Sequence, residues 1–213
     1  MLSGVGVGAA VLAFAGWQIA RVSPSEKVFE GQAKPPQAGP LCPWRQPETD
    51  LKELFPSATR YEPETRILSG LRTELAQRLG RVPTGDENAL HLYRVYGENS
   101  ELGTVLTRRV KGEYGAIELV LATDPDGRVC GLHLQRLREP ESITKALENP
   151  AWQHSFLGKS AESTWQTDEE KLEVPVEAQH SAQAVAEGVR SLVILLAAAD
   201  HAGAGGLVAG HHH

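Results

Sequence analysis

The stretch IELVLATDPDGRVCGLHLQRL, residues 117–137, decides the fold. Two runs with strand character, Ile117–Thr123 and Arg128–Leu137, flank the tetrapeptide Asp124-Pro125-Asp126-Gly127. A proline followed by a terminal glycine suits a tight turn between antiparallel strands. The stretch therefore predicts a β-hairpin.

Outward from the hairpin, the chain continues the sheet on one side and forms a long helix on the other. Leu90–Tyr96 and Thr104–Val110 have the composition of two further strands. A final helix is predicted to begin near Ser181, because apolar residues recur there at i, i+3, i+4 and i+7. These residues are Ala182, Val185, Ala186, Val189, Leu192, Val193 and Leu196.

Helices are also predicted before the sheet and directly after it. Asp50–Phe55 is a short helix ended by Pro56, and Ile143–Glu148 is another that ends before Pro150. Pro63–Leu79 is predicted as an amphipathic helix with proline at its start and Gly80 just past its end. Its apolar face would hold Ile67, Leu68, Leu71, Leu75 and Leu79. Strands enclosed between helices indicate an α+β domain with an antiparallel sheet and flanking helices.

The N-terminal part of the chain has a different composition. Leu2–Ala20 contains no charged residue and is about long enough to cross a bilayer as a helix. A cleaved signal peptide is the competing interpretation, since Ala13-Phe14-Ala15 has the small-x-small form, but a basic n-region is missing. Gly4 and Gly8 form a small-xxx-small pair that would let a partner helix approach closely.

We therefore expect four parts: a transmembrane anchor at 1–22, a proline-rich extended tether at 23–47, an α+β domain at 48–199 and a flexible tail at 200–213. The composition, with 41% apolar and 23% charged residues, is that of a folding domain. The net charge is -6 and the Lys and Arg residues are scattered, so the sequence shows no basic patch of the kind that binds nucleic acid.

The hairpin and its surroundings resemble a known family. The block Gly112-Glu113-Tyr114-Gly115-Ala116-Ile117, the Asp124–Gly127 turn and the following Val129 and Gly131 are similar to the central hairpin of the FMN-binding domain family. This family includes the flavin-carrying small subunits of the Rnf and Nqr electron-transport complexes. Further matches follow in the family's order, namely Arg138-Glu139-Pro140, Trp152, Phe156-Leu157-Gly158 and the helix of Ser181. The resemblance spans Leu90 to Leu196.

The resemblance implies that Gln179, Ser181, Glu139 and Tyr114 are the flavin-site equivalents, but the motif is degenerate. Gln179 stands where the family has its flavinylated threonine, and a carboxamide cannot form the phosphoester that a hydroxyl forms with FMN. Glu177 places a carboxylate near the expected phosphate, which would repel an anion. The resemblance therefore implies a domain that has lost covalent flavin.

Two functions follow as hypotheses. The first is a non-catalytic accessory subunit of a membrane electron-transfer or photosynthetic complex, held by its helix and domain surface to other subunits and to the lipid bilayer. The second is a flavoprotein that holds FMN non-covalently and relays electrons. The resemblance places the domain on the periplasmic side of the bacterial inner membrane, with a single span.

Other candidate residues have simpler interpretations. The histidines His91, His133, His154 and His180 fall on separate predicted elements, so no metal site is expected. Ser181 at the start of a periodic helix is interpreted as an N-cap. Cys42 and Cys130 lie in no metal-binding spacing, and whether they pair stays open.

Overall fold

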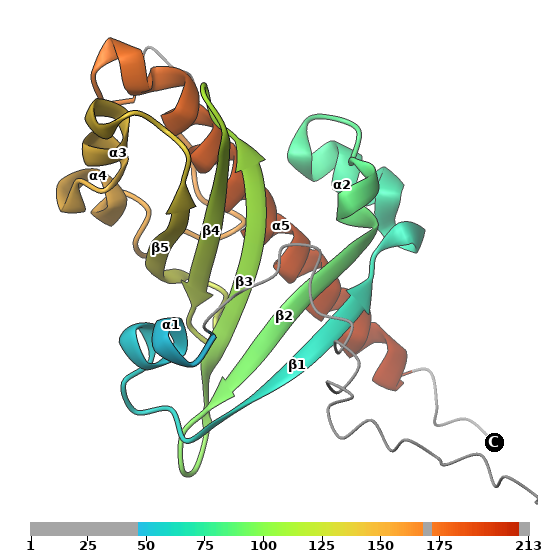
Figure 1. Cartoon of the computed structure of the whole chain (residues 1–213). Coiled ribbons are helices and arrows are strands. Elements are labelled where there is room, and N and C mark those ends of the chain that lie inside the picture. The colour runs from blue at the N-terminus through green and yellow to red at the C-terminus, as the bar shows by residue number, and fades with distance from the viewer. Residues whose placement is uncertain (1–46, 168–171, 209–213) are drawn as a thin grey trace, which may run out of the picture. The chain divides into compact units, whose positions relative to one another are not determined.

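The protein is described here by a computed structural model, which covers residues 47–167 and 172–208. Within these residues, five antiparallel strands form one sheet whose spatial order follows the chain (Figure 1). The strands are β1 (Arg60–Ile67), β2 (Ala89–Tyr96), β3 (Glu101–Lys111), β4 (Ala116–Thr123) and β5 (Val129–Leu137). The predicted α+β class, with an antiparallel sheet and flanking helices, is confirmed.

The hairpin that decides the fold forms as predicted. β4 pairs with β5 in antiparallel register, with Val120 opposite His133. At the turn, the Gly127 amide donates to the Asp124 carbonyl at 3.0 Å, and the Asp124 side chain accepts from the amides of Asp126 and Arg128. Gly127 has a φ of 73°, a conformation that glycine adopts without steric cost.

The helix predicted over Pro63–Leu79 is wrong in its first half. Residues 60–67 form the edge strand β1, while the helix α2 is confined to Arg72–Leu79 after a 3-10 turn at Ser69–Leu71. The physical reason is that charged residues recur at every second position in this stretch, a pattern that the helix prediction did not take into account. Arg60, Glu62, Glu64 and Arg66 alternate with Tyr61, Pro63, Thr65 and Ile67, which is typical of a strand. Proline is tolerated there because an edge strand leaves alternate amides unpaired.

The long helix α5 (Gln179–Val208) covers one face of the sheet and α1 (Pro47–Leu54) covers part of the other. Two separate apolar clusters reveal the two faces, since side chains alternate along each strand. The α5 face holds Leu92, Leu106, Leu119 and Leu121 beside the helix residues Ala182, Val185, Ala186, Val189, Leu192, Val193 and Leu196. The α1 face holds Val95, Val105, Val120 and Ala122 beside Leu51 and Phe55.

α5 is the core helix of this domain. Its length and composition would also suit a membrane span, but Ala182–Ala199 packs largely buried against the sheet and α2. The helix continues through Val208, past the domain end expected at residue 199. The predicted anchor at 1–22, with Gly4 and Gly8, lies outside the described residues, as does the tether up to residue 46.

Two short helices complete the end of the domain near the start of α5. α3 (Glu141–Leu147) and α4 (Pro150–His154) follow β5, and the Asn149 side chain caps α4 by accepting from the Ala151 amide at 2.9 Å. Ile143, Leu147, Trp152 and Phe156 of this region are buried in the cluster beneath α5. These helices close the core at the β5 side of the sheet (Figure 1).

Gly103 in β3 gives a test of how α1 approaches the sheet. Its φ is 152°, and a methyl group at this position would overlap the Thr123 carbonyl oxygen and lie 3.0 Å from the Phe55 ring. We expect Gly103→Ala to lower the free energy of unfolding by roughly 3 kcal/mol, measured by urea denaturation. Gly70→Ala is the control, because nothing lies within 4 Å of its added methyl group. Equal stability of the two variants would contradict the packing described here.

Candidate functional site

Three of the four predicted flavin-site equivalents meet at the turn between β3 and β4. The Glu113 amide donates to Ser181 Oγ of α5 at 2.9 Å. The Tyr114 amide donates to the Glu139 carboxylate at 3.2 and 3.3 Å. We call this region the tip: the turn Gly112–Gly115, Glu139, and Val176–Ser181. Residues far apart in the sequence are thus joined at one end of the sheet.

Gly112 lets the parts of the tip approach this closely. A methyl group on Gly112 would overlap Glu139 Oε1 and lie 2.9 Å from both Ser181 Oγ and Ile117 Cδ1. The turn is closed by a bond from the Gly112 amide to the Gly115 carbonyl at 2.8 Å. The close approach therefore depends on glycine at this position.

The remaining details of the tip differ from the prediction. Ser181 lies inside the first turn of α5, which begins at Gln179, and its hydroxyl binds the β3–β4 turn instead of capping the helix. Tyr114 contributes only its backbone amide, because its side chain is 69% exposed. Gln179 is half-buried at the start of α5 and takes no part in the hydrogen bonds described for the tip.

The arrangement leaves the tip chemically satisfied. Consecutive amides in a glycine-rich turn are groups that can bind an anion. Here the amides of Glu113 and Tyr114 already donate to a hydroxyl and a carboxylate of the same chain. A phosphate at this position would have to displace the Glu139 carboxylate, which carries the same sign of charge.

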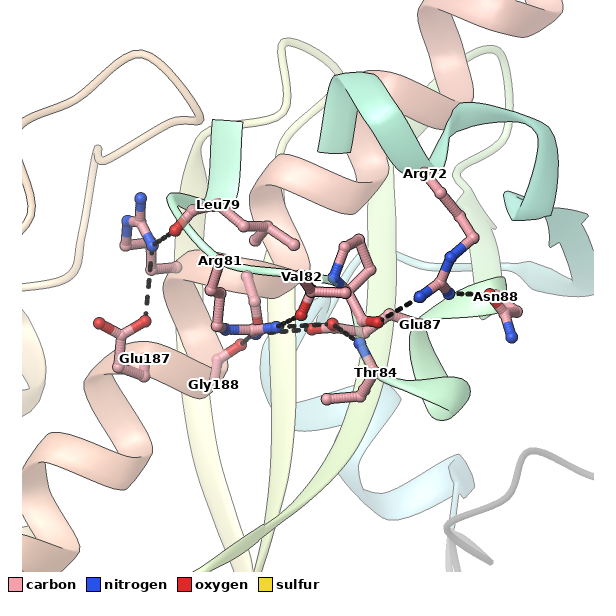
Figure 2. Close-up of polar contacts among 12 residues, drawn as sticks. Arg72, Leu79, Arg81, Val82, Thr84, Glu87, Asn88, Glu187 and Gly188 are labelled. Atoms are coloured by element: carbon pink, nitrogen blue, oxygen red, sulfur yellow. Dashed lines mark hydrogen bonds and ion pairs between the residues drawn. The ribbon is translucent and has the colours of Figure 1, made fainter. Parts of the chain in front are cut away.

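A buried ion network that the sequence did not reveal lies between α2, β3 and α5 (Figure 2). Glu87, with a side chain 1% exposed, accepts two hydrogen bonds from Arg81 at 2.8 Å each and one from the Thr84 amide at 2.8 Å. Arg108 of β3 donates to the same carboxylate at 3.1 Å and also to Ser191 of α5. Thr84 and Glu87 have the spacing of a capping box. This spacing is the sequence pattern from which the position of Glu87 could have been predicted.

The electrostatics of this network favour the charged form of Glu87. Burial alone would raise the pKa of its carboxyl, but the hydrogen bonds from Arg81 and Thr84 and the charge of Arg108 lower that pKa to about 2. Burial lowers the pKa of the Arg108 guanidinium, an effect that Glu87 opposes. All the groups are paired with one another, so we interpret the network as structural.

A second cluster of charges surrounds Arg94 on β2. Arg94 pairs with Glu64 at 3.3 Å, with Glu101 at 3.2 Å and with Asp200 of α5. Arg94, Glu64 and Glu101 are among the residues that line an open, polar cavity of about 540 Å³ over β1 and β2. Because Asp200 belongs to α5 and Arg94 to β2, their ion pair helps to fix the C-terminal half of α5 on the sheet.

An aromatic pocket of about 310 Å³ lies beside α4. Trp152 and Phe156 pack edge to face with ring centroids 5.1 Å apart, and the ammonium of Lys159 lies 5.2 Å from the Trp165 ring. Trp152 and Phe156 line the pocket together with Lys159, Asn149, Ser155, Gln166, Leu172 and Glu173. Its lining thus joins two aromatic rings to several hydrogen-bonding side chains.

Within the residues that the structure describes, the histidines and Cys130 are not arranged as a reactive site. His133 lies 3.4 Å from Asp50 and 3.6 Å from Glu53, while His91 shares a hydrogen bond with Thr65 at 2.9 Å. In the described part of the chain, no group of three or more His, Cys, Asp or Glu is placed to hold a metal ion. Partial burial, together with the Asp124 charge, raises the pKa of the Cys130 thiol to about 11, which disfavours the nucleophilic thiolate.

No protein-family model matches the chain, and no curated protein matches it either. The resemblance to the FMN-binding domain family therefore stays a prediction from the residues.

Glu87→Gln tests the ion network. The folded-state pKa lies below the unfolded value of 4.5, so the charge of Glu87 stabilises the fold above about pH 4.5 and loses this effect as the pH falls toward 2. The shift corresponds to about 3 kcal/mol. We expect the variant to lose this much stability at pH 7, measured by urea denaturation, and to differ less from the parent at pH 3.

The matched control is Glu74→Gln. Glu74 also faces an arginine, Arg78, but at 4.0 Å and with its side chain 50% exposed. We expect its effect to stay within about 0.5 kcal/mol at every pH. A pH-independent loss in the Glu87→Gln variant would contradict the electrostatic role assigned to this carboxylate.

Proposed function

We propose that this protein is a membrane-anchored, non-catalytic accessory subunit of a bacterial membrane electron-transfer or photosynthetic complex. Its anchor would be the helix at 1–22, packed against a partner helix through Gly4 and Gly8. Its domain, of the FMN-binding type without covalent flavin, would lie on the periplasmic side. The single observation that carries the proposal is the closed tip, in which Glu139 and Ser181 bind the turn amides.

The chemistry of the tip favours a protein-binding role over a flavin-carrying one. The backbone donors of the turn are satisfied by the chain itself, which removes the gain that a phosphate would obtain there. The nearby Glu177 is exposed and adds a second carboxylate. The residue at the position of the flavin-linked threonine is Gln179, which has no hydroxyl group to link.

The tip also carries the kind of surface that binds another protein. The side chains of Tyr114 and Val176 are 69% and 79% exposed, although both are apolar and large. They stand on segments that the Glu113–Ser181 hydrogen bond holds together. Exposed tyrosine on a rigid support is enriched in protein interfaces, because it brings contact area at low entropic cost.

The second candidate, a flavoprotein with non-covalent FMN, is favoured by one observation. The aromatic pocket beside α4 has a volume of about 310 Å³ and combines Trp152 and Phe156 with several hydrogen-bonding side chains. A planar aromatic ring system would suit this lining. The pocket supports binding of a ring, and Lys159 is the one cation for a phosphate among the described residues of its lining.

The two candidates differ in bound flavin. We expect the full chain, purified from its membrane in mild detergent and then denatured, to release no stoichiometric flavin, and the denatured polypeptide to carry no flavin fluorescence. The measurement is fluorescence of the supernatant and of the protein band. One FMN per chain in either fraction would overturn the accessory role as stated and support the flavoprotein.

The docking role of the tip is tested by the double variant Tyr114→Ser with Val176→Ser. We expect it to fold with unchanged stability, because both side chains are exposed, yet to co-purify with markedly less of its partner subunits. Val82→Ser is the matched control, since Val82 is 75% exposed but follows the end of α2 and is not one of the tip residues. Equal loss of partners in both variants would exclude the tip as the docking surface.

A further inference from the structure

Four basic side chains gather on the α1 face of the sheet, at the end where β3 turns into β4. The face follows from the strand pairing: Glu118 of β4 lies two residues from Val120, which packs on that side, and side chains two residues apart share a face. The four residues come from β3 and from the end of β5. We call them the basic cluster: Arg109, Lys111, Arg136 and Arg138.

The pairing of the strands sets these cations in two rows across β4. In the first row, Arg109 and Arg136 both lie opposite Glu118. In the second row, the Arg138 amide donates at 3.3 Å to the carbonyl of the β4 residue that lies opposite Lys111. The rows are about 7 Å apart along the strands, and β3 and β5 are about 10 Å apart across β4. The four cations therefore surround a small area of the sheet.

Glu118 pairs with only two members of the basic cluster. Its side chain, 4% exposed, lies 2.7 Å from Arg109 and 3.9 Å from Arg136. Lys111 and Arg138 are exposed, and within residues 47–167 and 172–208 neither side chain has an ion pair or a hydrogen bond. These two side chains therefore present positive charge to the solvent, beside the two arginines that hold Glu118.

We propose that the basic cluster binds an acidic segment of a partner protein, with Lys111 and Arg138 as the main contacts. The inference rests on the proposed accessory role and names the chemistry of the partner. In an extended segment, carboxylates at every second position point to one side and are about 7 Å apart. The cations of β3 have the same spacing, so a segment lying along this strand would pair with both of them.

The charges around the basic cluster favour a protein over a membrane surface as its partner. Glu113 follows Lys111 by two residues, Glu177 precedes α5, and both are exposed. The hydrogen bond from the Glu113 amide to Ser181 holds these segments together at this end of the sheet (Figure 1). A bilayer with anionic headgroups is negative over its whole surface and would repel these carboxylates. A protein can place acidic residues opposite the cluster alone.

Binding of an acidic peptide to the full chain tests the proposal. The chain is kept in micelles of an uncharged detergent at low salt, and the probe is a fluorescent peptide of alternating glutamate and serine, followed by anisotropy. We expect saturable binding to the parent chain that weakens steeply as salt is added. The double variant Lys111→Gln with Arg138→Gln should weaken the binding about tenfold, because two charge contacts are lost.

The matched control is the double variant Lys52→Gln with Arg128→Gln. Both cations are exposed and, in the described part of the chain, have no ion pair, but they lie on α1 and on the β4–β5 turn. The control removes the same amount of charge from the chain. We expect its affinity for the peptide to stay within about twofold of the parent, since exposed charges outside the site are screened.

Two results with these chains would overturn the proposal: no saturable binding to the parent, or equal weakening in the two double variants. Displacement of the peptide by phosphatidylglycerol added to the micelles would also overturn it, because the cluster would then bind the lipid surface. The Tyr114→Ser with Val176→Ser variant keeps the basic cluster and should bind the peptide like the parent, even where it loses its partner subunits. Failure of the proposed function and failure of this inference are therefore seen in different variants.

Discussion

The burial of α5 against the sheet is the interaction on which the rest of the structure depends. Val185, Val189, Leu192 and Leu196 are at most 2% exposed, and they face a layer of leucines from β2, β3 and β4. Each such side chain contributes on the order of 2 kcal/mol by leaving water. α2, α3 and the tip all pack on this helix as well. Without α5, one whole face of the sheet would lack a cover.

Apolar burial is not directional, so polar contacts fix where α5 lies along the sheet. Ser181 binds the β3–β4 turn near the start of the helix, Ser191 meets Arg108 in the middle, and Asp200 pairs with Arg94 toward the end. Arg190 adds hydrogen bonds to the carbonyls at the end of α2. We infer that these contacts define the register of the helix, whereas the leucines supply most of its stability. The Ser181 bond that closes the tip is one of these contacts.

Local patterns predicted much of this fold from the sequence. The β4–β5 hairpin was predicted from its strand composition and its clear turn, and α5 from its unbroken apolar period. The error at Pro63–Leu79 arose where two periods overlap: Ile67, Leu68 and Leu71 fit a helix, while the alternating charges at 60–66 specify the edge strand. The tip residues were named from the resemblance, but the bonds from Glu113 to Ser181 and from Tyr114 to Glu139 join distant segments. No local pattern encodes such bonds, and the same holds for Glu87 and Arg108.

The proposed function depends on whether the tip amides are engaged by the protein itself or remain available to a ligand. The most direct measurement follows the amide resonances of Glu113 and Tyr114 by NMR while FMN is added to the full chain in detergent micelles. Our account predicts that both resonances stay unmoved at a large excess of FMN, because Ser181 and Glu139 already hold these amides. A saturable shift of both resonances would contradict it.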